Sequence, residues 1–243
     1  MTKRKRADVV LVERGLFESR ARAQAAIAAG LVRADGATVR KPSDEVAEDA
    51  VLQATPEHRW VSRGALKLVA ALDHFGFDPG GDICLDVGAS TGGFTEVLLA
   101  NGANKVYAVD VGRGQLHARL RDDPAVLSLE ETDIRKLDPA RFSEPPEFAT
   151  VDVSFISLKL VLPALDRLLR RPARLIALIK PQFEAGRAPL KKGIVRDPAV
   201  HAAVCEEIGA FARSLGWGIA GIIPSPIEGG EGNREFLLGA TRD

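Results

Sequence analysis

The chain has 243 residues, 46% of them hydrophobic, which is enough for one full core and a small second domain of about 60 residues. Cys84 and Cys205 lie far apart in apolar surroundings, and the four histidines form no ligand spacing, so neither a disulfide framework nor a metal site is expected. The basic first six residues precede no apolar stretch, and the longest uncharged segment, 214–227, contains two prolines and three glycines. These features predict a cytoplasmic protein without a signal peptide or membrane span.

The net charge of zero hides an uneven distribution. Residues 1–41 hold ten Lys or Arg against four Asp or Glu, a balance of +6, whereas 42–60 has a balance of −4. A basic module of this kind is the electrostatic footprint of a surface that contacts phosphates. A solvated charged surface without a partner is the alternative.

The first 54 residues predict a small α+β unit of two helices and a hairpin. Ser19 is suited to cap the second helix and Gly30 to end it, while Asp35-Gly36 is a strong signal for a hairpin turn. The expected elements are a short helix from Val9 to near Gly15, a helix at 20–29, and strands at 31–33, 38–40 and 51–53.

From Ser62 onward the chain alternates helix and strand, after a linker expected at 55–61. Apolar runs such as 173–179 are typical of strands buried on both faces of a parallel sheet, and the last two strands suit an antiparallel hairpin at its edge. Residues 62–243 therefore predict a Rossmann-like α/β domain that follows the small domain, 1–54. The expected helices are 62–74, 93–101, 114–121, 157–170 and 198–215, and the strands 82–86, 105–110, 126–129, 148–153, 173–179, 217–224 and 234–240.

A glycine-rich turn, Asp86–Phe94, follows the first strand of this domain. Its glycines let a ligand approach the backbone closely, but Ser90 stands where a dinucleotide-binding turn has its middle glycine. A carboxylate at the mouth, Asp86, would repel a pyrophosphate and suits a ligand with an ammonium and a sulfonium group. The turn therefore favours S-adenosylmethionine over a nicotinamide dinucleotide.

Two aspartates at later strand ends complete the predicted cofactor site. Asp110 is placed to accept hydrogen bonds from the ribose hydroxyls, and Asp133 from the adenine amino group with Ile134 against the ring. Either aspartate could instead cap a loop. The predicted cofactor residues are Asp86, Gly88, Ala89, Ser90, Gly92, Gly93, Phe94, Asp110, Val111, Asp133 and Ile134.

The basic module resembles the alpha-L RNA-binding motif of a small-subunit ribosomal protein and of pseudouridine synthases. The resemblance covers about 45 residues and rests on Ser19-Arg20-x-x-Ala23, Ile27, Gly30, Val32, the hairpin and Val39. It implies that structured RNA contacts Arg6, Arg20, Arg22 and, more loosely, Arg14, mainly through phosphates. A helical hairpin that only packs against the larger domain is the alternative.

Four longer runs resemble the TlyA, or haemolysin-A-like, ribosomal RNA methyltransferases, which are related to the FtsJ/RrmJ 2′-O-methyltransferases. The runs are 62–68, 86–94, 152–158 and 179–184. The resemblance implies a cytidine 2′-hydroxyl of ribosomal RNA or ribosomal subunits as the acceptor. It also implies a catalytic tetrad: Lys67, Asp152, Lys180 and Glu235.

A ribose 2′-hydroxyl is a weak nucleophile and needs a base or a polarising partner. Because a free lysine has a pKa of about 10.4, a basic lysine needs burial or a second cation nearby. We expect Lys180 to act as the base and Lys67 to position the 2′-oxygen, with the two carboxylates orienting the ammonium groups. Phe183 is expected to stack on a base. The alternatives are a lysine that only snorkels at a strand end and carboxylates that only cap turns.

Other functions fit the sequence less well. The run Asp152-Val153-Ser154-Phe155 lacks the two prolines typical of methyltransferases that act on exocyclic amines. A non-catalytic ribosome-assembly factor and a membrane-lytic haemolysin are the remaining alternatives, and intact tetrad positions and the lack of a spanning segment argue against them. No obligate protein partner is expected.

Overall fold

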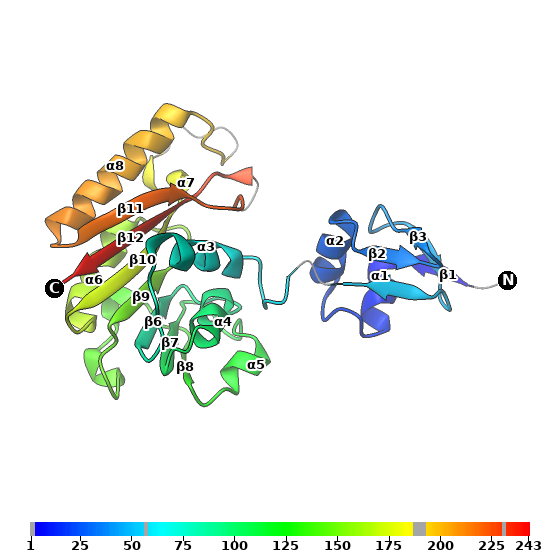
Figure 1. The fold of residues 1–243 in the computed structure, drawn as a ribbon, viewed down its shortest axis with the longest axis horizontal. Helices are drawn as coiled ribbons and strands as arrows, with labels where there is room; N and C mark the ends of the chain where they lie inside the picture. Colours follow the sequence, from blue (N-terminus) through cyan, green and yellow to red (C-terminus); the bar gives the residue numbers. More distant parts are fainter. Residues whose placement is uncertain (1–2, 56–57, 187–192, 230–231) are drawn as a thin grey trace. The chain divides into compact units, whose positions relative to one another are not determined.

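The computed structural model describes residues 3–55, 58–186, 193–229 and 232–243. The chain divides into two compact units, residues 1–59 and 60–243, which are drawn in Figure 1 and described separately below. The linker predicted at 55–61 includes residues 56–57, which lie outside the described residues.

The N-terminal unit contains two helices and two small antiparallel sheets. Helices α1 (Ala7–Glu13) and α2 (Arg20–Ala28) lie close to their predicted positions. In one sheet, β2 (Val32–Ala34) pairs with both β3 (Ala37–Thr38) and β5 (Leu52–Ala54). The other sheet pairs β1 (Arg4–Arg6) with β4 (Glu45–Ala47), two strands that the sequence did not predict because they are short and mostly charged.

Local signals in this unit act as expected. The Ser19 hydroxyl accepts a hydrogen bond from the Arg22 amide at 3.4 Å and so caps α2. Asp35 and Gly36 both have positive φ, +49° and +79°, as a two-residue hairpin turn between right-twisted strands requires. The two helices and the sheet then bury a shared apolar core that includes Leu11 and Ile27.

The second unit is built on a seven-stranded sheet with the order β11-β12-β10-β9-β6-β7-β8. The five strands from β10 to β8 in this order are parallel, and β12 is antiparallel to both of its neighbours, which confirms the predicted hairpin at the edge. The strands are β6 (Ile83–Val87), β7 (Lys105–Val109), β8 (Val126–Leu129), β9 (Phe148–Val151), β10 (Ala173–Ile179), β11 (Gly218–Pro224) and β12 (Phe236–Arg242).

Helices cover both faces of this sheet (Figure 1). Helices α3 (Ala65–Phe75) and α4 (Gly93–Ala100) pack on one face, and α6 (Leu158–Leu168) and α8 (Pro198–Ser214) on the other. Short helical segments are α5 (Ala118–Arg121), η1 (Ile134–Lys136), η2 (Pro139–Arg141) and α7 (Pro181–Glu184). No helix within the described ranges is long and apolar enough to cross a membrane.

Helix α5 is shorter than the predicted 114–121, and the backbone conformation before it explains the difference. The Glu130 carboxylate accepts hydrogen bonds from the backbone amides of Gly114, Gln115 and Leu116, at 2.6, 2.7 and 3.1 Å. Gly114 has a positive φ of +62°, and His117, with φ −57° and ψ 137°, is the N-cap of α5, so neither residue is helical. The segment therefore forms a loop beside the carboxyl ends of β7 and β8.

Candidate active site

The strand order reverses between β6 and β9, and this is where open α/β sheets bind ligands, outside the carboxyl ends of the strands. A cavity of about 500 Å³ lies at this position. Its walls come from the segments that follow four parallel strands, and they include Gly88 after β6, Asp110 after β7, Asp133 beyond β8 and Asp152 after β9.

Six of the predicted cofactor residues line this cavity: Gly88, Ser90, Asp110, Val111, Asp133 and Ile134. The Asp110 carboxylate accepts hydrogen bonds from the Ser90 amide at 2.8 Å and the Gly112 amide at 2.7 Å, so it joins two loops at the rim. Asp133 caps η1 and forms an ion pair with Arg135 at 2.7 Å. The loop-cap alternative therefore describes part of what each aspartate does, although both border the cavity.

The other five predicted cofactor residues are buried and do not line the cavity: Asp86, Ala89, Gly92, Gly93 and Phe94. Phe94 is 4% exposed and belongs to the core under α3 and α4. A Cβ at Gly92 would lie 2.3 Å from a Leu120 methyl, and one at Gly93 would lie 2.2 Å from the Ser62 hydroxyl. These two glycines are needed for helix packing around the turn.

Asp86 differs most from its predicted place at the mouth of the site. Its side chain is fully buried and accepts hydrogen bonds from the hydroxyls of Thr95 at 2.6 Å and Thr150 at 2.9 Å. Burial in a low-dielectric interior raises the pKa of Asp86 to about 6, because the two hydroxyls only partly replace the lost hydration. The carboxylate therefore links β6, α4 and β9 below the cavity.

We expect this burial to give the second unit a stability that falls with pH. Folded Asp86 binds its proton more tightly than unfolded Asp86, so the free energy of unfolding decreases as the pH rises from about 4 to about 6 and is flat above. The displacement from the usual 3.8 to about 6 corresponds to about 3 kcal/mol, of which about half falls between pH 5 and 8. The Asp86→Asn variant should lack this component.

Urea unfolding at pH 5 and pH 8, followed by tryptophan fluorescence, measures the effect. Both tryptophans, Trp60 and Trp217, are buried and belong to the second unit. Asp73→Asn is the matched control, because Asp73 is an exposed carboxylate on α3. Equal pH dependence of wild type and Asp86→Asn would contradict the assignment.

Two lysine–carboxylate ion pairs join the four tetrad candidates in pairs. Lys180 Nζ lies 2.6 Å from Asp152 Oδ1, and Lys67 Nζ lies 2.5 Å from Glu235 Oε2. Ile179 pairs with Phe236 across β10 and β12, so Lys180 and Glu235, the next residues out, lie at the same edge of the sheet. The cluster holds two cations and two carboxylates and is neutral overall.

The tetrad side chains are largely withdrawn from water. Lys67, Lys180 and Glu235 are 7%, 8% and 4% exposed, whereas the Asp152 side chain is 20% exposed and borders the cofactor cavity. Buried ion pairs of this kind cost desolvation energy and are weak evidence for a role in stability alone. One of the four, Asp152, lines the ligand cavity, and buried ionisable groups at a cavity are candidates for a functional site.

Sequence reasoning did not single out Ser154 or Phe155 as site residues. The Ser154 hydroxyl accepts a hydrogen bond from Lys180 Nζ at 2.9 Å. Phe155 is 91% exposed, has a positive φ of +63°, and lies with its ring centre 5.0 Å from that of Phe183. A large exposed aromatic in a strained conformation is a feature of binding sites, but only the structure reveals the strain and the exposure. Gln115 and Arg135 also line the cavity without having been predicted.

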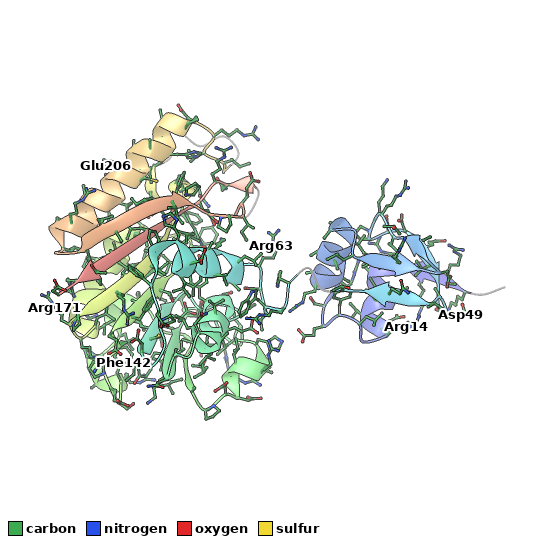
Figure 2. All side chains as sticks on the ribbon, in the orientation of Figure 1. Arg14, Asp49, Arg63, Phe142, Arg171 and Glu206 are labelled. Carbon is green, nitrogen blue, oxygen red and sulfur yellow. The ribbon has the colours of Figure 1, made fainter. Side chains whose placement is uncertain are left out.

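The arginines predicted to contact RNA all have partners within the N-terminal unit. Arg6 and Arg20 form ion pairs with Asp8, at 3.0 and 2.7 Å. Arg22 donates to the His58 carbonyl at 3.2 Å. Arg14 donates to the Ala50 carbonyl at 2.5 Å, and Figure 2 labels it near Asp49, the neighbour of Ala50.

In the part of the chain that the structure describes, no group of three or more His, Cys, Asp or Glu side chains is arranged to hold a metal ion. Both cysteines are free; Cys84 is buried and Cys205 is partly buried.

Comparison with known proteins places this architecture in a family. Residues 60–242 match the FtsJ-like methyltransferase model, and residues 5–52 match the S4 domain model. The chain is 49% identical to Bacillus subtilis YqxC over 98% of this chain and 85% of that protein. It is 46% identical to the 16S/23S rRNA (cytidine-2′-O)-methyltransferase TlyA of Mycobacterium tuberculosis, over 98% of this chain and 90% of that protein.

A solved structure supports the same assignment. A hemolysin-named protein of Streptococcus thermophilus matches all of this chain and 90% of its own chain, with a TM-score of 0.79 and 45% identity. Membership of this family accounts for the reversed strand order and for the cavity beside it. It also accounts for the S4 domain, which precedes the methyltransferase domain in the chain. The chain belongs to the FtsJ-like family of S-adenosylmethionine-dependent methyltransferases, as a homologue of the TlyA proteins that carries an N-terminal S4 domain.

Proposed function

We propose that this protein transfers a methyl group from S-adenosylmethionine to the 2′-hydroxyl of a cytidine in ribosomal RNA. The observation that carries the proposal is the Lys180–Asp152 ion pair, whose carboxylate lines the cofactor cavity, with the Lys67–Glu235 ion pair next to it at the ends of β10 and β12. A ribose hydroxyl needs proton removal and positioning rather than metal or covalent chemistry, and lysines with carboxylate partners are suited to both. The named activity of the M. tuberculosis relative agrees with this chemistry.

The cavity fits the cofactor in size and in donor set. Its volume of about 500 Å³ is within the range of about 300–1,000 Å³ that small-ligand sites occupy. Gly88 would lie under the cofactor, Asp110 would accept from the ribose hydroxyls, and Asp133 would accept from the adenine amine. When bound, S-adenosylmethionine supplies an electrophilic methyl group.

Residues of the chain remove the proton of the 2′-hydroxyl and position its oxygen. Lys180 takes the proton of the 2′-hydroxyl after its own proton has passed to solvent, and Asp152 and Ser154 hold its Nζ in place. Lys67, held by Glu235, orients the 2′-oxygen for attack in line with the departing sulfur. The proton ends on Lys180 and returns to solvent after product release.

The aromatic pair and the basic unit provide the contacts with RNA. Phe155 and Phe183 offer exposed ring surface next to Ser154, which suits stacking on a nucleobase at the site. Arg6, Arg20 and Arg22 on the S4 domain contact phosphates of folded RNA. We infer a reaction in the cytoplasm on ribosomal RNA or ribosomal subunits, with no obligate protein partner.

Mass mapping of ribosomal RNA from cells with and without the gene tests the proposal. We expect one or more cytidines to lose a ribose-linked methyl group when the gene is deleted, and the purified protein to restore it with S-adenosylmethionine. A methyl group on a base, or no change in methylation, would contradict it. Methylation unchanged while ribosome assembly fails would favour the non-catalytic assembly factor.

A further inference from the structure

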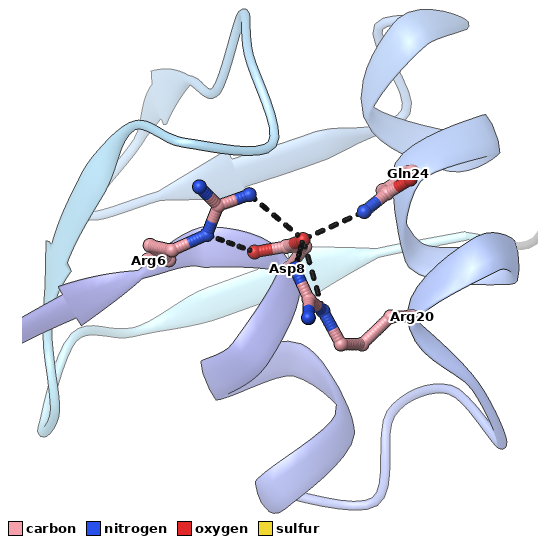
Figure 3. A network of polar contacts seen from close by, with 4 residues as sticks. All are labelled: Arg6, Asp8, Arg20 and Gln24. Carbon is pink, nitrogen blue, oxygen red and sulfur yellow. Dashed lines mark hydrogen bonds and ion pairs between the residues drawn. The ribbon is translucent and has the colours of Figure 1, made fainter.

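A buried carboxylate organises the basic surface of the N-terminal unit. Asp8 lies in α1 and is 0% exposed, yet its two oxygens accept five hydrogen bonds from side chains (Figure 3). Arg6 donates Nε–H at 3.0 Å and Nη2–H at 3.1 Å, and Arg20 donates Nε–H at 3.2 Å and Nη2–H at 2.7 Å. Gln24 donates its amide at 2.7 Å.

The two guanidinium groups remain partly open to solvent although their partner is buried. The side chains of Arg6 and Arg20 are 48% and 56% exposed. A guanidinium has five N–H donors, so each group that gives two to Asp8 keeps three for another partner. The three ionised groups together carry a net charge of +1.

The spacing of the two groups suits one phosphate. Both arginines donate an Nη2–H to the same atom, Asp8 Oδ2, so these nitrogens lie no more than about 6 Å apart. Two cations at this distance repel, and without the shared carboxylate they would separate. The hydrogen bonds from Arg6, together with those from Arg20 and Gln24, hold the pKa of Asp8 well below its usual range, so the carboxylate keeps its charge at neutral pH.

We propose that Asp8 is a positioning residue which holds Arg6 and Arg20 together as a clamp for a single RNA phosphate group. The inference rests on the proposed function, since it assumes that RNA is the partner of this unit. Fixing both guanidinium planes in the free protein removes the entropy cost of ordering two long side chains when the phosphate binds. The competing explanation is an ion pair that only ties α1 to α2.

The direction in which RNA affinity changes when Asp8 loses its charge distinguishes the phosphate clamp from an ion pair that is only structural. Asp8→Asn removes a negative charge from a surface that binds a polyanion, so long-range electrostatics alone would tighten RNA binding. Loss of the clamp predicts the opposite result. Asp49→Asn is the matched control, because Asp49 is an exposed carboxylate of the same unit and its loss changes the charge equally.

The experiment measures the Kd of the full chain for deproteinised 16S and 23S ribosomal RNA at several salt concentrations. For Asp8→Asn we expect about tenfold weaker binding, and a slope of log Kd against log salt that is reduced by roughly 0.9, the loss of one phosphate contact. Asp49→Asn should bind as tightly as wild type or slightly more tightly. Wild-type or tighter binding by a folded Asp8→Asn protein would overturn the proposal.

Hydrogen–deuterium exchange over α1 and α2 shows whether Asp8→Asn keeps its fold. If it does not, Arg6→Lys and Arg20→Lys decide, because lysine keeps the charge but cannot donate in a planar fork. Each should weaken RNA binding by about threefold or more, and wild-type affinity in both would overturn the clamp.

The same variants separate this inference from the proposed function. Asp8→Asn should bind S-adenosylmethionine as wild type does and should methylate saturating ribosomal RNA with unchanged kcat and a raised KM. Absence of methyl transfer in the wild-type protein would refute the proposed function, whereas an RNA affinity that does not respond to Asp8 would refute the clamp.

Discussion

Lys180→Ala should lower the rate of methyl transfer by about 10³-fold while leaving the affinity for S-adenosylmethionine within about threefold of wild type. Lys180 follows β10, is 8% exposed, and is the side chain that contacts both Asp152 and the Ser154 hydroxyl. Its removal takes away the proposed base and leaves Asp152 without its ion-pair partner. Single-turnover transfer to ribosomal RNA, together with calorimetric titration of the cofactor, measures both quantities.

Lys159→Ala is the matched control for this variant. Lys159 also lies in the second unit and is paired with a carboxylate, Glu207, but the pair is at the surface on α6 and α8. It should transfer methyl groups at the wild-type rate. Undiminished transfer by Lys180→Ala would remove the tetrad from the mechanism, and lost cofactor binding would indicate a damaged fold instead.

Gly88→Ala should destabilise the second unit by about 3 kcal/mol or more and greatly weaken cofactor binding. Gly88 has a φ of +84°, and a Cβ there would lie 2.3 Å from the Asp152 carbonyl oxygen. Because that atom belongs to the backbone, relief of the clash must move the end of β6 or the end of β9. Movement of β6 displaces the cavity wall at Gly88, and movement of β9 displaces the wall at Asp152.

Gly102→Ala separates the clash from the backbone strain. Gly102 has nearly the same φ, +85°, but the nearest atom to its Cβ would be 3.6 Å away. It should cost only about 1 kcal/mol and leave cofactor binding unchanged. Urea unfolding followed by tryptophan fluorescence measures the stability of both variants, and calorimetry measures their affinity for the cofactor. Equal destabilisation would show that the close contact at Gly88 does not contribute to the free energy of unfolding.

Local signals predicted most of the fold, since they are written in adjacent residues. Ser19 caps α2, Asp35 and Gly36 form the hairpin turn, and the apolar run 173–179 is a buried central strand. The predictions failed where a distant side chain decides the backbone path. A loop with Gly114 at positive φ and its amides bound to Glu130 replaces the start of the helix predicted at 114–121, and β1 is a strand because β4 lies beside it.

The candidate site was predicted unevenly for the same reason. The end of each parallel strand is visible in the sequence, which placed Gly88, Asp110 and Asp152 near one another. Which way a side chain faces depends on packing. Asp86 therefore lies under the cavity with Thr95 and Thr150, although it stands only two residues before Gly88.

The sequence by itself determined the domain types and the α/β architecture, because hydrophobic period, turn residues and short motifs are local properties of the chain, and its resemblance to a known family supplied the proposed tetrad. Only the tertiary structure decided which charges meet. It paired Lys180 with Asp152 and Lys67 with Glu235, exposed Phe155, and gathered Arg6 and Arg20 around Asp8. Coulombic attraction and burial act between residues that are distant in the chain, so these contacts exist only once the fold has brought the residues together.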